Sequence, residues 1–587
     1  MRNVKIVCTL GPASEDRVTI RRLADAGMSI ARLNASHGTV ENRAELAERV
    51  RAVDDATDEP LAVMLDLRGP EVRTAETDAE TELEAGSIVQ FREGTTVTSE
   101  RVGTTHSIAA VDPGDVVLLD DGRIETAVDR VEGDAVYARV ESGGTLGSRA
   151  GVTTRDVDLG LDLVGDVDRQ NLELAAEHGA DLVAASFVRD REDIYEIADI
   201  LKRFGADDTA IVAKIERSAA VENIEGIVDA ADGVMIARGD LGVECPLEDV
   251  PVIQKRIIHR CVDSGVPVIT ATEMLDSMVA SRRPTRAEAS DVANAVFDGT
   301  DAVMLSGETA VGEYPVETVE TMATIVDRIE RSGGYVETRD GRVPPAEAGV
   351  RTDAVARSAR YLADDVNATA IVCLSESGYT ARKAAKFRPS VPIVAVTPND
   401  RVRRQLAVTW GVDARYATYA ADMDAVLRTA VDGAVEAGVA ESGDTIVVLA
   451  GMMNDLPDTD VTNTLKVHVV AETVSTGRTV VAGQVAAPIA RTADGDLSAV
   501  PDGSIVVLPP GFDGEFDGDV SVIAGVVATE SGLTGYPAIV ARELGVPMLA
   551  GATLPPSVEG GDIVTLDGER GVVYEGDITG NSRDERP

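Results

Sequence analysis

IVAKIERSAAVENIEGIVDAADGVMIARGD, residues 211–240, holds two buried strand patterns on either side of a helix-length segment. The strand patterns IVAKI and GVMIA are rich in apolar residues and do not alternate strictly, which is typical of parallel strands covered on both faces. Polar residues follow each of them, with Glu216 after the first and Gly239 and Asp240 after the second. The stretch therefore predicts neighbouring βα units with charged groups at the carboxyl ends of their strands.

The same strand pattern recurs along the first part of the chain. Six further segments show it: VKIVCTL (4–10), MSIARL (28–33), LAVMLDL (61–67), DLVAAS (181–186), VPVITAT (266–272) and DAVMLS (301–306). Helix-length segments such as EDRVTIRRLADAG separate most of these strands. Eight βα units in about 250 residues predict an α/β fold of the (β/α)8 TIM-barrel class.

Three further regions interrupt or follow this barrel. After the third strand pattern, glycine-rich turns and segments such as GDVVLLDDGRIETAV predict a small inserted β-barrel. An insertion there lies at the rim that carries barrel active sites, so we expect a mobile lid or, alternatively, a passive decoration. Downstream, alternating helices and strands predict a doubly wound α/β domain and then a β-rich unit. The predicted boundaries are 1–71 and 154–340 for the barrel, 72–153 for the insert, 341–471 for the α/β domain and 473–587 for the last unit.

The chain is strongly acidic. Its 587 residues hold 101 Asp and Glu against 55 Lys and Arg, for a net charge of −46, and only seven residues are lysines. This charge argues against a nucleic-acid partner, because binding phosphates needs the opposite sign. The acid is dispersed, and self-repulsion of this size needs screening. The composition therefore favours a halophilic protein over an ordinary acidic one.

No segment predicts export or membrane insertion. The N-terminal MRNVKIVCTL runs straight into a strand pattern without a signal-peptide layout, and no apolar run reaches about 18 residues. The four cysteines are widely spaced and form no CxxC pair, so neither zinc nor a disulfide framework is predicted. We expect a cytoplasmic protein without a membrane partner.

Charged residues gather at the predicted strand ends. Arg32, Arg73 and Lys214 are cations that suit phosphoryl oxygens. Glu216 and Asp240 follow adjacent strands and suit a hard divalent ion such as Mg²⁺. Any one of these residues could form a structural ion pair. A whole ring of strand ends that carries such groups predicts an active site instead.

The segments around these residues form long motifs. They are KIVCTLGPAS, ARLNASHG, LDLRGPEVR, KIE, ARGDLGVE, ITATEMLDSM, RRPTRAEASDVANAVFDGTDAVMLSGETA and GEYP. In this order they closely resemble the pyruvate kinase family over residues 4–320, and looser similarity extends to about residue 470. The resemblance implies a phosphotransferase that moves the phosphoryl group of phosphoenolpyruvate onto ADP, giving pyruvate and ATP in the last step of glycolysis. It further implies Mg²⁺ (or Mn²⁺) and K⁺ as cofactors and a cytoplasmic homotetramer.

The resemblance also assigns roles to individual positions. The implied catalytic residues are Lys214, Thr272 and Arg32. The implied substrate contacts are Arg32, Lys214, Gly239, Asp240 and Thr272. The implied Mg²⁺ ligands are Glu216 and Asp240, and the implied nucleotide contacts are Asn34, His37 and Arg73. The implied K⁺ ligands are Asn34, Ser36, Asp66 and the carbonyl of Leu67.

Some positions depart from the family pattern. Arg217 replaces the Asn of the family's KIEN motif, and Leu67 replaces the Thr of its LDT motif. Ala150 stands where the family usually has a nucleotide-contacting Lys. Residues 523–551 resemble the swivelling mobile domain of phosphoenolpyruvate-utilising enzymes. Its carrier histidine is replaced by Tyr536, which predicts a retained fold without the chemistry.

The α/β domain offers a candidate effector site. The loop SESGYT opens a predicted helix and either caps it or binds an effector phosphate through Ser375, Ser377 and Thr380. The acidic segment GMMNDLPDTD lacks cations for a second phosphate, which argues against fructose bisphosphate. Two alternatives to the main hypothesis remain, namely another Mg²⁺-dependent phosphoenolpyruvate or pyruvate barrel enzyme and a degenerate regulatory homologue.

Overall fold

A computed structural model describes residues 2–155, 157–418, 423–451 and 462–579. The chain divides into two compact units. The first unit comprises residues 1–361, 372–433 and 449–464, and the second comprises 362–371, 434–448 and 465–587. The barrel and its insert therefore lie in the first unit, the last domain lies in the second, and the α/β domain contributes segments to both.

Eight parallel strands close into a barrel, which confirms the predicted fold class. They are β1 (Lys5–Thr9), β2 (Ile30–Asn34), β3 (Ala62–Asp66), β13 (Leu182–Ala185), β14 (Ala210–Ile215), β15 (Gly233–Ala237), β16 (Val268–Ala271) and β17 (Ala302–Leu305). Their order around the barrel is β1-β17-β16-β15-β14-β13-β3-β2. Each segment with a buried strand pattern in the sequence thus supplies one strand.

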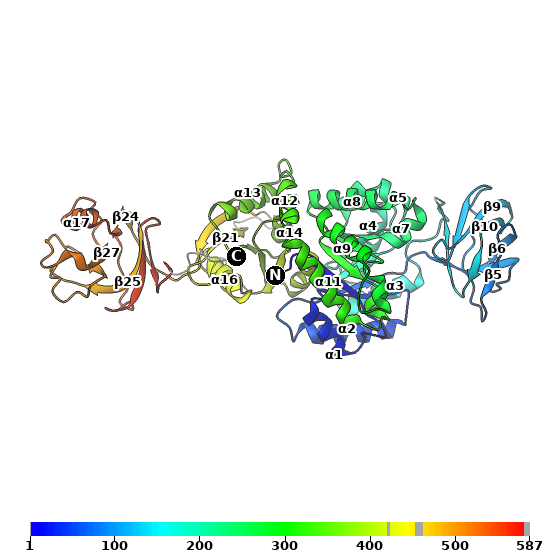
Figure 1. The fold of residues 1–587 in the computed structure, drawn as a ribbon, viewed down its shortest axis with the longest axis horizontal. Coiled ribbons are helices and arrows are strands. Elements are labelled where there is room, and N and C mark those ends of the chain that lie inside the picture. Colours follow the sequence, from blue (N-terminus) through cyan, green and yellow to red (C-terminus); the bar gives the residue numbers. More distant parts are fainter. Residues whose placement is uncertain (1, 156, 419–422, 452–461, 580–587) are drawn as a thin grey trace. The chain divides into compact units, whose positions relative to one another are not determined.

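Helices surround the barrel strands, as Figure 1 shows. Those of the barrel region are α1 (Arg17–Ala26), α2 (Val40–Asp54), α3 (Asp166–Glu177), α4 (Arg191–Arg203), α5 (Ser218–Glu222), α6 (Ile224–Ala230), α7 (Arg238–Glu244), α8 (Val250–Ser264), η1 (Asp276–Val279), α9 (Arg286–Asp298), α10 (Gly307–Ala310), α11 (Pro315–Glu330) and α12 (Gly333–Gly341). Side chains such as Val7, Met64 and Met235 fill the barrel interior, while Ile6, Val63 and Val234 pack outward against the helices. The barrel is therefore a packed core, and access to its polar groups comes from the strand ends.

The inserted domain consists of short strands between β3 and α3. They are β4 (Val72–Arg73), β5 (Thr81–Leu83), β6 (Ile88–Glu93), β7 (Arg101–Thr104), β8 (Val116–Leu119), β9 (Ile124–Glu132), β10 (Ala135–Ser142), β11 (Gly144–Leu146) and β12 (Gly151–Thr154). Seven of them form one sheet, in the order β4-β12-β8-β9-β10-β6-β7, and β11 pairs with β5. Alternate residues such as Val89, Phe91, Val136 and Val140 form its apolar core.

The α/β domain holds a five-stranded sheet in the order β20-β19-β18-β21-β22. Its elements are α13 (Arg351–Asp365), β18 (Ala370–Leu374), α14 (Tyr379–Lys386), β19 (Ile393–Thr397), α15 (Asp400–Gln405), η2 (Leu406–Val408), β20 (Val412–Tyr416), α16 (Met423–Glu436), β21 (Thr445–Ala450) and β22 (Thr464–Val469). The segment GMMNDLPDTD lies outside the described residues except for Gly451.

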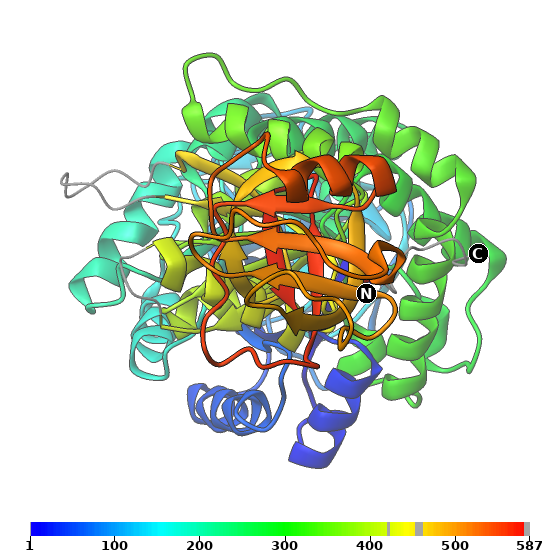
Figure 2. The same cartoon turned by 90° about the vertical axis from the view of Figure 1, so that its left-hand side faces the viewer.

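The last domain is built around an eight-stranded sheet in the order β23-β30-β29-β25-β26-β27-β28-β24. Its elements are β23 (Thr473–Thr476), β24 (Arg478–Val481), β25 (Gln484–Arg491), β26 (Ser504–Leu508), η3 (Val520–Val522), β27 (Ile523–Ala528), α17 (Tyr536–Leu544), β28 (Met548–Ala550), β29 (Ile563–Asp567) and β30 (Val572–Glu575). Figure 2 looks onto this domain, drawn in orange and red, with its helix beside the strands. Tyr536 begins that helix, and its ring lies 6.1 Å from the ring of Phe516.

None of the helices in the described part of the chain is both long enough and apolar enough to span a membrane.

Candidate functional site

Lys214 lies at the centre of the charged groups at the barrel strand ends. Its Nζ atom lies 2.7 Å from Glu216 Oε1, 2.7 Å from Ser186 Oγ and 3.3 Å from Asp66 Oδ1. The residue is only 9% exposed. Burial acts to lower the pKa of Lys214, but the charges of Asp66 and Glu216 outweigh it and raise the pKa well above its ordinary value. Lys214 is therefore a fixed ammonium group at neutral pH.

Arg32 holds the neighbouring carboxylate. Its Nε atom donates to Asp66 Oδ2 at 2.5 Å, and its Nη1 atom donates to Thr9 Oγ1 at 2.9 Å. Burial acts to raise the pKa of Asp66, but Arg32 and Lys214 outweigh it and hold the pKa below its ordinary value. Asp66 is thus a buried carboxylate that holds Arg32 and Lys214 side by side.

Glu216 and Asp240 follow adjacent strands, as the sequence predicts. Glu216 is buried and accepts a 2.7 Å hydrogen bond at Oε2 from the backbone N–H of Phe187. Asp240 lies in the first turn of α7 and keeps solvent access, but it lies in a cleft with protein on most sides. Desolvation and then the charge of Glu216 raise the pKa of Asp240 to about 7. Two neighbouring carboxylates of this kind are suited to share a divalent cation.

Thr272 and Gly239 meet at the ends of β16 and β15. The Gly239 N–H donates to Thr272 Oγ1 at 2.8 Å, and that hydroxyl donates to the Ala271 carbonyl at 2.6 Å. Arg238 donates to the carbonyl of Thr272 at 2.7 Å. The backbone of Thr272 has φ +68°, a conformation that costs a β-branched residue about 1–3 kcal/mol and often occurs at functional sites. The hydroxyl is therefore held in one orientation at the barrel rim.

The predicted nucleotide contacts lie on two segments. Arg73 on β4 forms a 2.6 Å ion pair with Glu71 and donates to the Arg149 carbonyl at 2.9 Å. His37 is exposed in the turn after β2, and its backbone N–H donates to the Asn34 carbonyl. The structure brings Arg73 and Arg149 together at the base of the insert.

Protein groups already bind several oxygens of the predicted K⁺ site. Asn34 pairs in register with Asp66 across β2 and β3, and Asn34 Oδ1 accepts from the Ser36 N–H at 3.0 Å. The Leu67 carbonyl accepts from Ser186 Oγ at 2.7 Å. The four predicted residues are therefore neighbours, and binding a cation would require their oxygens to share or exchange hydrogen-bond partners.

A cleft of about 50 Å³ lies between the insert and the barrel. Its ionisable lining residues are Glu71, Asp121, Glu216, Asp240, Glu244 and Arg217. No sequence pattern assigns a role to Asp121 or Glu244, although the Asp120–Asp121–Gly122 turn is a local signal for a tight loop. Across the described ranges, no three His, Cys, Asp or Glu side chains form a group that could hold a metal alone. A divalent ion here would take ligands from the substrate as well as from Glu216 and Asp240.

The predicted effector loop caps a helix. Ser375 Oγ accepts from the Thr380 N–H and Ser377 Oγ accepts from the Tyr379 N–H, each at 3.4 Å. The Thr380 hydroxyl lies 2.7 Å from the Thr462 hydroxyl. These contacts support the helix-cap reading, and binding of an effector phosphate stays a prediction.

Comparison with known proteins gives family matches along most of the chain. The model of the pyruvate kinase barrel domain matches residues 1–319, that of the pyruvate kinase alpha/beta domain matches residues 353–468, and that of the mobile domain of PEP-utilising enzymes matches residues 500–571. A pyruvate kinase of Geobacillus stearothermophilus is 40% identical over 593 residues, and one of Bacillus licheniformis is 39% identical over 587 residues. Each alignment covers 98% of this chain and 99% of the relative.

Proposed function

The chain belongs to the pyruvate kinase family, and we propose that its barrel transfers the phosphoryl group of phosphoenolpyruvate to ADP, giving pyruvate and ATP. One observation carries the proposal. The Lys214 ammonium group contacts Ser186 and Glu216, and the Asp240 carboxylate interacts electrostatically with both Glu216 and Lys214. Because phosphoryl transfer leaves little covalent chemistry to the protein, positioning and charge neutralisation supply most of the rate enhancement.

Each residue then has a chemical task. Arg32 binds the phosphate of the substrate, and Lys214 neutralises the phosphoryl group during transfer. Glu216 and Asp240 would hold Mg²⁺ (or Mn²⁺), which supplies positive charge for the substrate carboxylate and the forming enolate when it is bound. Thr272, oriented by the Gly239 N–H, lies on the path that delivers a proton to the enolate carbon.

The nucleotide is proposed to bind at the barrel rim beside the insert. Asn34, His37 and Arg73 would contact it, and the insert would act as a lid that excludes water. Arg149 directly precedes Ala150, the position where the family usually has a nucleotide-contacting lysine, and it is the nearest cation to that position in the sequence. The Arg149 carbonyl accepts a hydrogen bond from Arg73. The protein is further proposed to be a cytoplasmic homotetramer with a surface adapted to high salt.

We expect the enzyme to depend on K⁺. Glu71 is a carboxylate paired with Arg73 at 2.6 Å, so its side chain supplies no positive charge that could replace the ion. Replacing KCl by tetramethylammonium chloride of equal ionic strength should lower kcat about tenfold or more, because one positive charge near the phosphoryl group is lost. Steady-state rates in the two salts measure this. Full activity without K⁺ would contradict the assignment of Asn34, Ser36, Asp66 and Leu67.

The last domain should be dispensable for catalysis, because the proposed catalytic groups all precede β17. A chain that ends near residue 472 is expected to keep kcat within a few-fold in molar KCl. It should melt at a lower temperature, because truncation removes Tyr574 and Ile578 from their apolar cluster with Val469. No phosphate should appear on Tyr536, whose ring packs near Phe516. A folded, normally assembled truncation without activity, or phosphotyrosine formed from phosphoenolpyruvate, would refute this reading.

The alternative functions are weaker. A degenerate regulatory homologue would be expected to lack some of Lys214, Glu216, Asp240 and Thr272, and all four are present and clustered at neighbouring strand ends. A phosphoenolpyruvate synthase needs a carrier histidine, and the corresponding position is Tyr536. An assay for pyruvate formed from phosphoenolpyruvate and ADP tests the proposal directly.

A further inference from the structure

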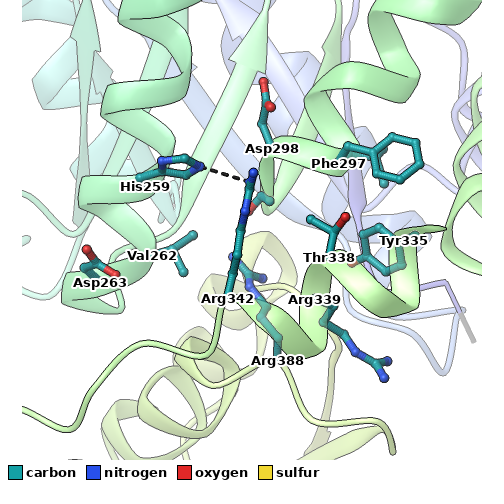
Figure 3. Close-up of a pocket in the computed structure, with 12 residues that line it drawn as sticks. His259, Val262, Asp263, Phe297, Asp298, Tyr335, Thr338, Arg339, Arg342 and Arg388 are labelled. Atoms are coloured by element: carbon teal, nitrogen blue, oxygen red, sulfur yellow. Dashed lines mark hydrogen bonds between the residues drawn. The ribbon is translucent and has the colours of Figure 1, made fainter. Parts of the chain in front are cut away.

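A second cavity, of about 310 Å³, lies away from the catalytic groups. Helices α8, α9 and α12 form its walls, and Arg388, which follows α14, closes one side (Figure 3). None of the predicted catalytic, metal or nucleotide residues lines it. The cavity is large enough for a small organic molecule, and the proposed phosphoryl transfer does not use it.

Aromatic residues are concentrated beside this cavity, although the chain has few of them. The whole sequence contains one Trp and seven Phe. The rings of Phe297 and Tyr335 meet edge to face at 6.2 Å, and both residues line the cavity. The Nε1–H of the single tryptophan, Trp410, donates to the Tyr335 hydroxyl at 3.3 Å. Together with Val262 and Val296, the side chains of Phe297 and Tyr335 give the cavity an apolar wall.

Cations form another part of the lining. Arg342 runs through the cavity toward His259, and its Nη1 atom lies 3.2 Å from His259 Nε2 (Figure 3). Among the described residues, Arg342 forms no ion pair with a carboxylate. Arg388 is anchored by Asp301 at 3.0 Å and by the Gly299 carbonyl at 2.9 Å, and it stacks on the Trp410 ring at 4.9 Å. Arg339, which also lines the cavity, is paired with Asp340, so among the described lining arginines Arg342 is the one without a carboxylate partner.

Two carboxylates also face the cavity, and they limit what it can bind. Asp298 is already bound by Lys255, and its Oδ2 atom accepts from Gln254 at 3.1 Å. Asp263 is exposed at the rim. A ligand must therefore place its negative charge near Arg342 and its apolar part against Tyr335 and Phe297. This separation selects a molecule with one charged end and one flat end.

We propose that this cavity is a binding site for a small aromatic anion, with a carboxylate or phosphate on Arg342 and a flat ring against Tyr335 and Phe297. A ligand bound in the cavity would lie beside Arg388, which hydrogen bonds connect to the barrel strands β16 and β17. Asp301, which binds Arg388, precedes β17 and also accepts from the Val268 N–H at the start of β16. Thr272 follows the end of that strand. The proposal does not depend on which reaction the barrel performs.

The single tryptophan provides the test. Full-length protein in molar KCl is titrated with phenyl phosphate, and Trp410 fluorescence should change and saturate, because the indole contacts Tyr335 and Arg388. Inorganic phosphate, which lacks the ring, and benzyl alcohol, which lacks the charge, should each bind at least about tenfold more weakly. The Lys214→Ala variant should titrate like wild type, which separates this cavity from the catalytic site.

Two substitutions should weaken binding, and one should not. Arg342→Gln removes the charge and Thr338→Phe fills the cavity, and each should raise the dissociation constant about tenfold or more. Arg331→Gln removes an exposed arginine outside the cavity and should leave the constant unchanged. An unchanged Trp410 signal in wild type would overturn the proposal, as would wild-type affinity in both cavity variants. Equal affinity for inorganic phosphate would overturn the role of the rings.

Discussion

Replacing Lys214 by alanine is expected to lower kcat at least about 100-fold, while substrate binding becomes weaker but stays detectable. Lys214 is a buried ammonium group that contacts Ser186, Glu216 and Asp66, and its charge is proposed to act mainly on the phosphoryl group in transit. Removing an interaction made chiefly in the transition state lowers kcat more than it raises KM. Steady-state kinetics with varied phosphoenolpyruvate measure both constants.

A matched control separates this effect from a general loss of a lysine. Lys202→Ala removes an exposed lysine from α4 and should leave kcat unchanged. Circular dichroism must show that Lys214→Ala is folded, because the substitution leaves Glu216 and Asp66 with one cation fewer. Near-normal turnover in the folded Lys214→Ala variant would remove this residue from the mechanism.

Dilution into low salt is expected to unfold or inactivate the protein. With a net charge of −46, lowering KCl from 1 M to 0.01 M extends the screening distance from about 3 Å to about 30 Å, so repulsion between surface carboxylates grows. The melting temperature should fall by more than about 10 °C over this range. Circular dichroism melts at a series of KCl concentrations measure the change.

A second salt distinguishes screening from a specific need for K⁺. Tetramethylammonium chloride screens charge as KCl does, so it should preserve the melting temperature while activity falls for lack of K⁺. A melting temperature that stays constant from molar to millimolar KCl would contradict the proposed salt adaptation.

The strand order of the barrel and its charged rim could be read from the sequence. Buried parallel strands have a pattern that differs from the helices between them, and polar residues such as Glu216 and Asp240 come directly after it. Since strand ends of a closed barrel meet at one rim, the grouping of Lys214, Glu216 and Asp240 follows from topology alone.

Other features depend on packing that no local pattern records. The hydrogen bonds that occupy Asn34 Oδ1 and the Leu67 carbonyl come from Ser36 and Ser186, and their geometry appears only in the folded chain. The second cavity is formed by His259, Arg342 and Arg388, which are far apart in sequence and share no motif. Contacts between distant side chains are set by tertiary packing, so the sequence predicted the charged rim and missed this cavity.

The central claim is that this barrel makes pyruvate, and one measurement tests it most directly. Purified full-length protein is assayed in molar KCl with Mg²⁺, phosphoenolpyruvate and ADP, and pyruvate and ATP are quantified separately. The account predicts that both products form in equal amounts, that each requires ADP, and that Lys214→Ala makes neither at an appreciable rate. Folded wild-type protein that forms no pyruvate, or that forms pyruvate without ATP, would contradict it.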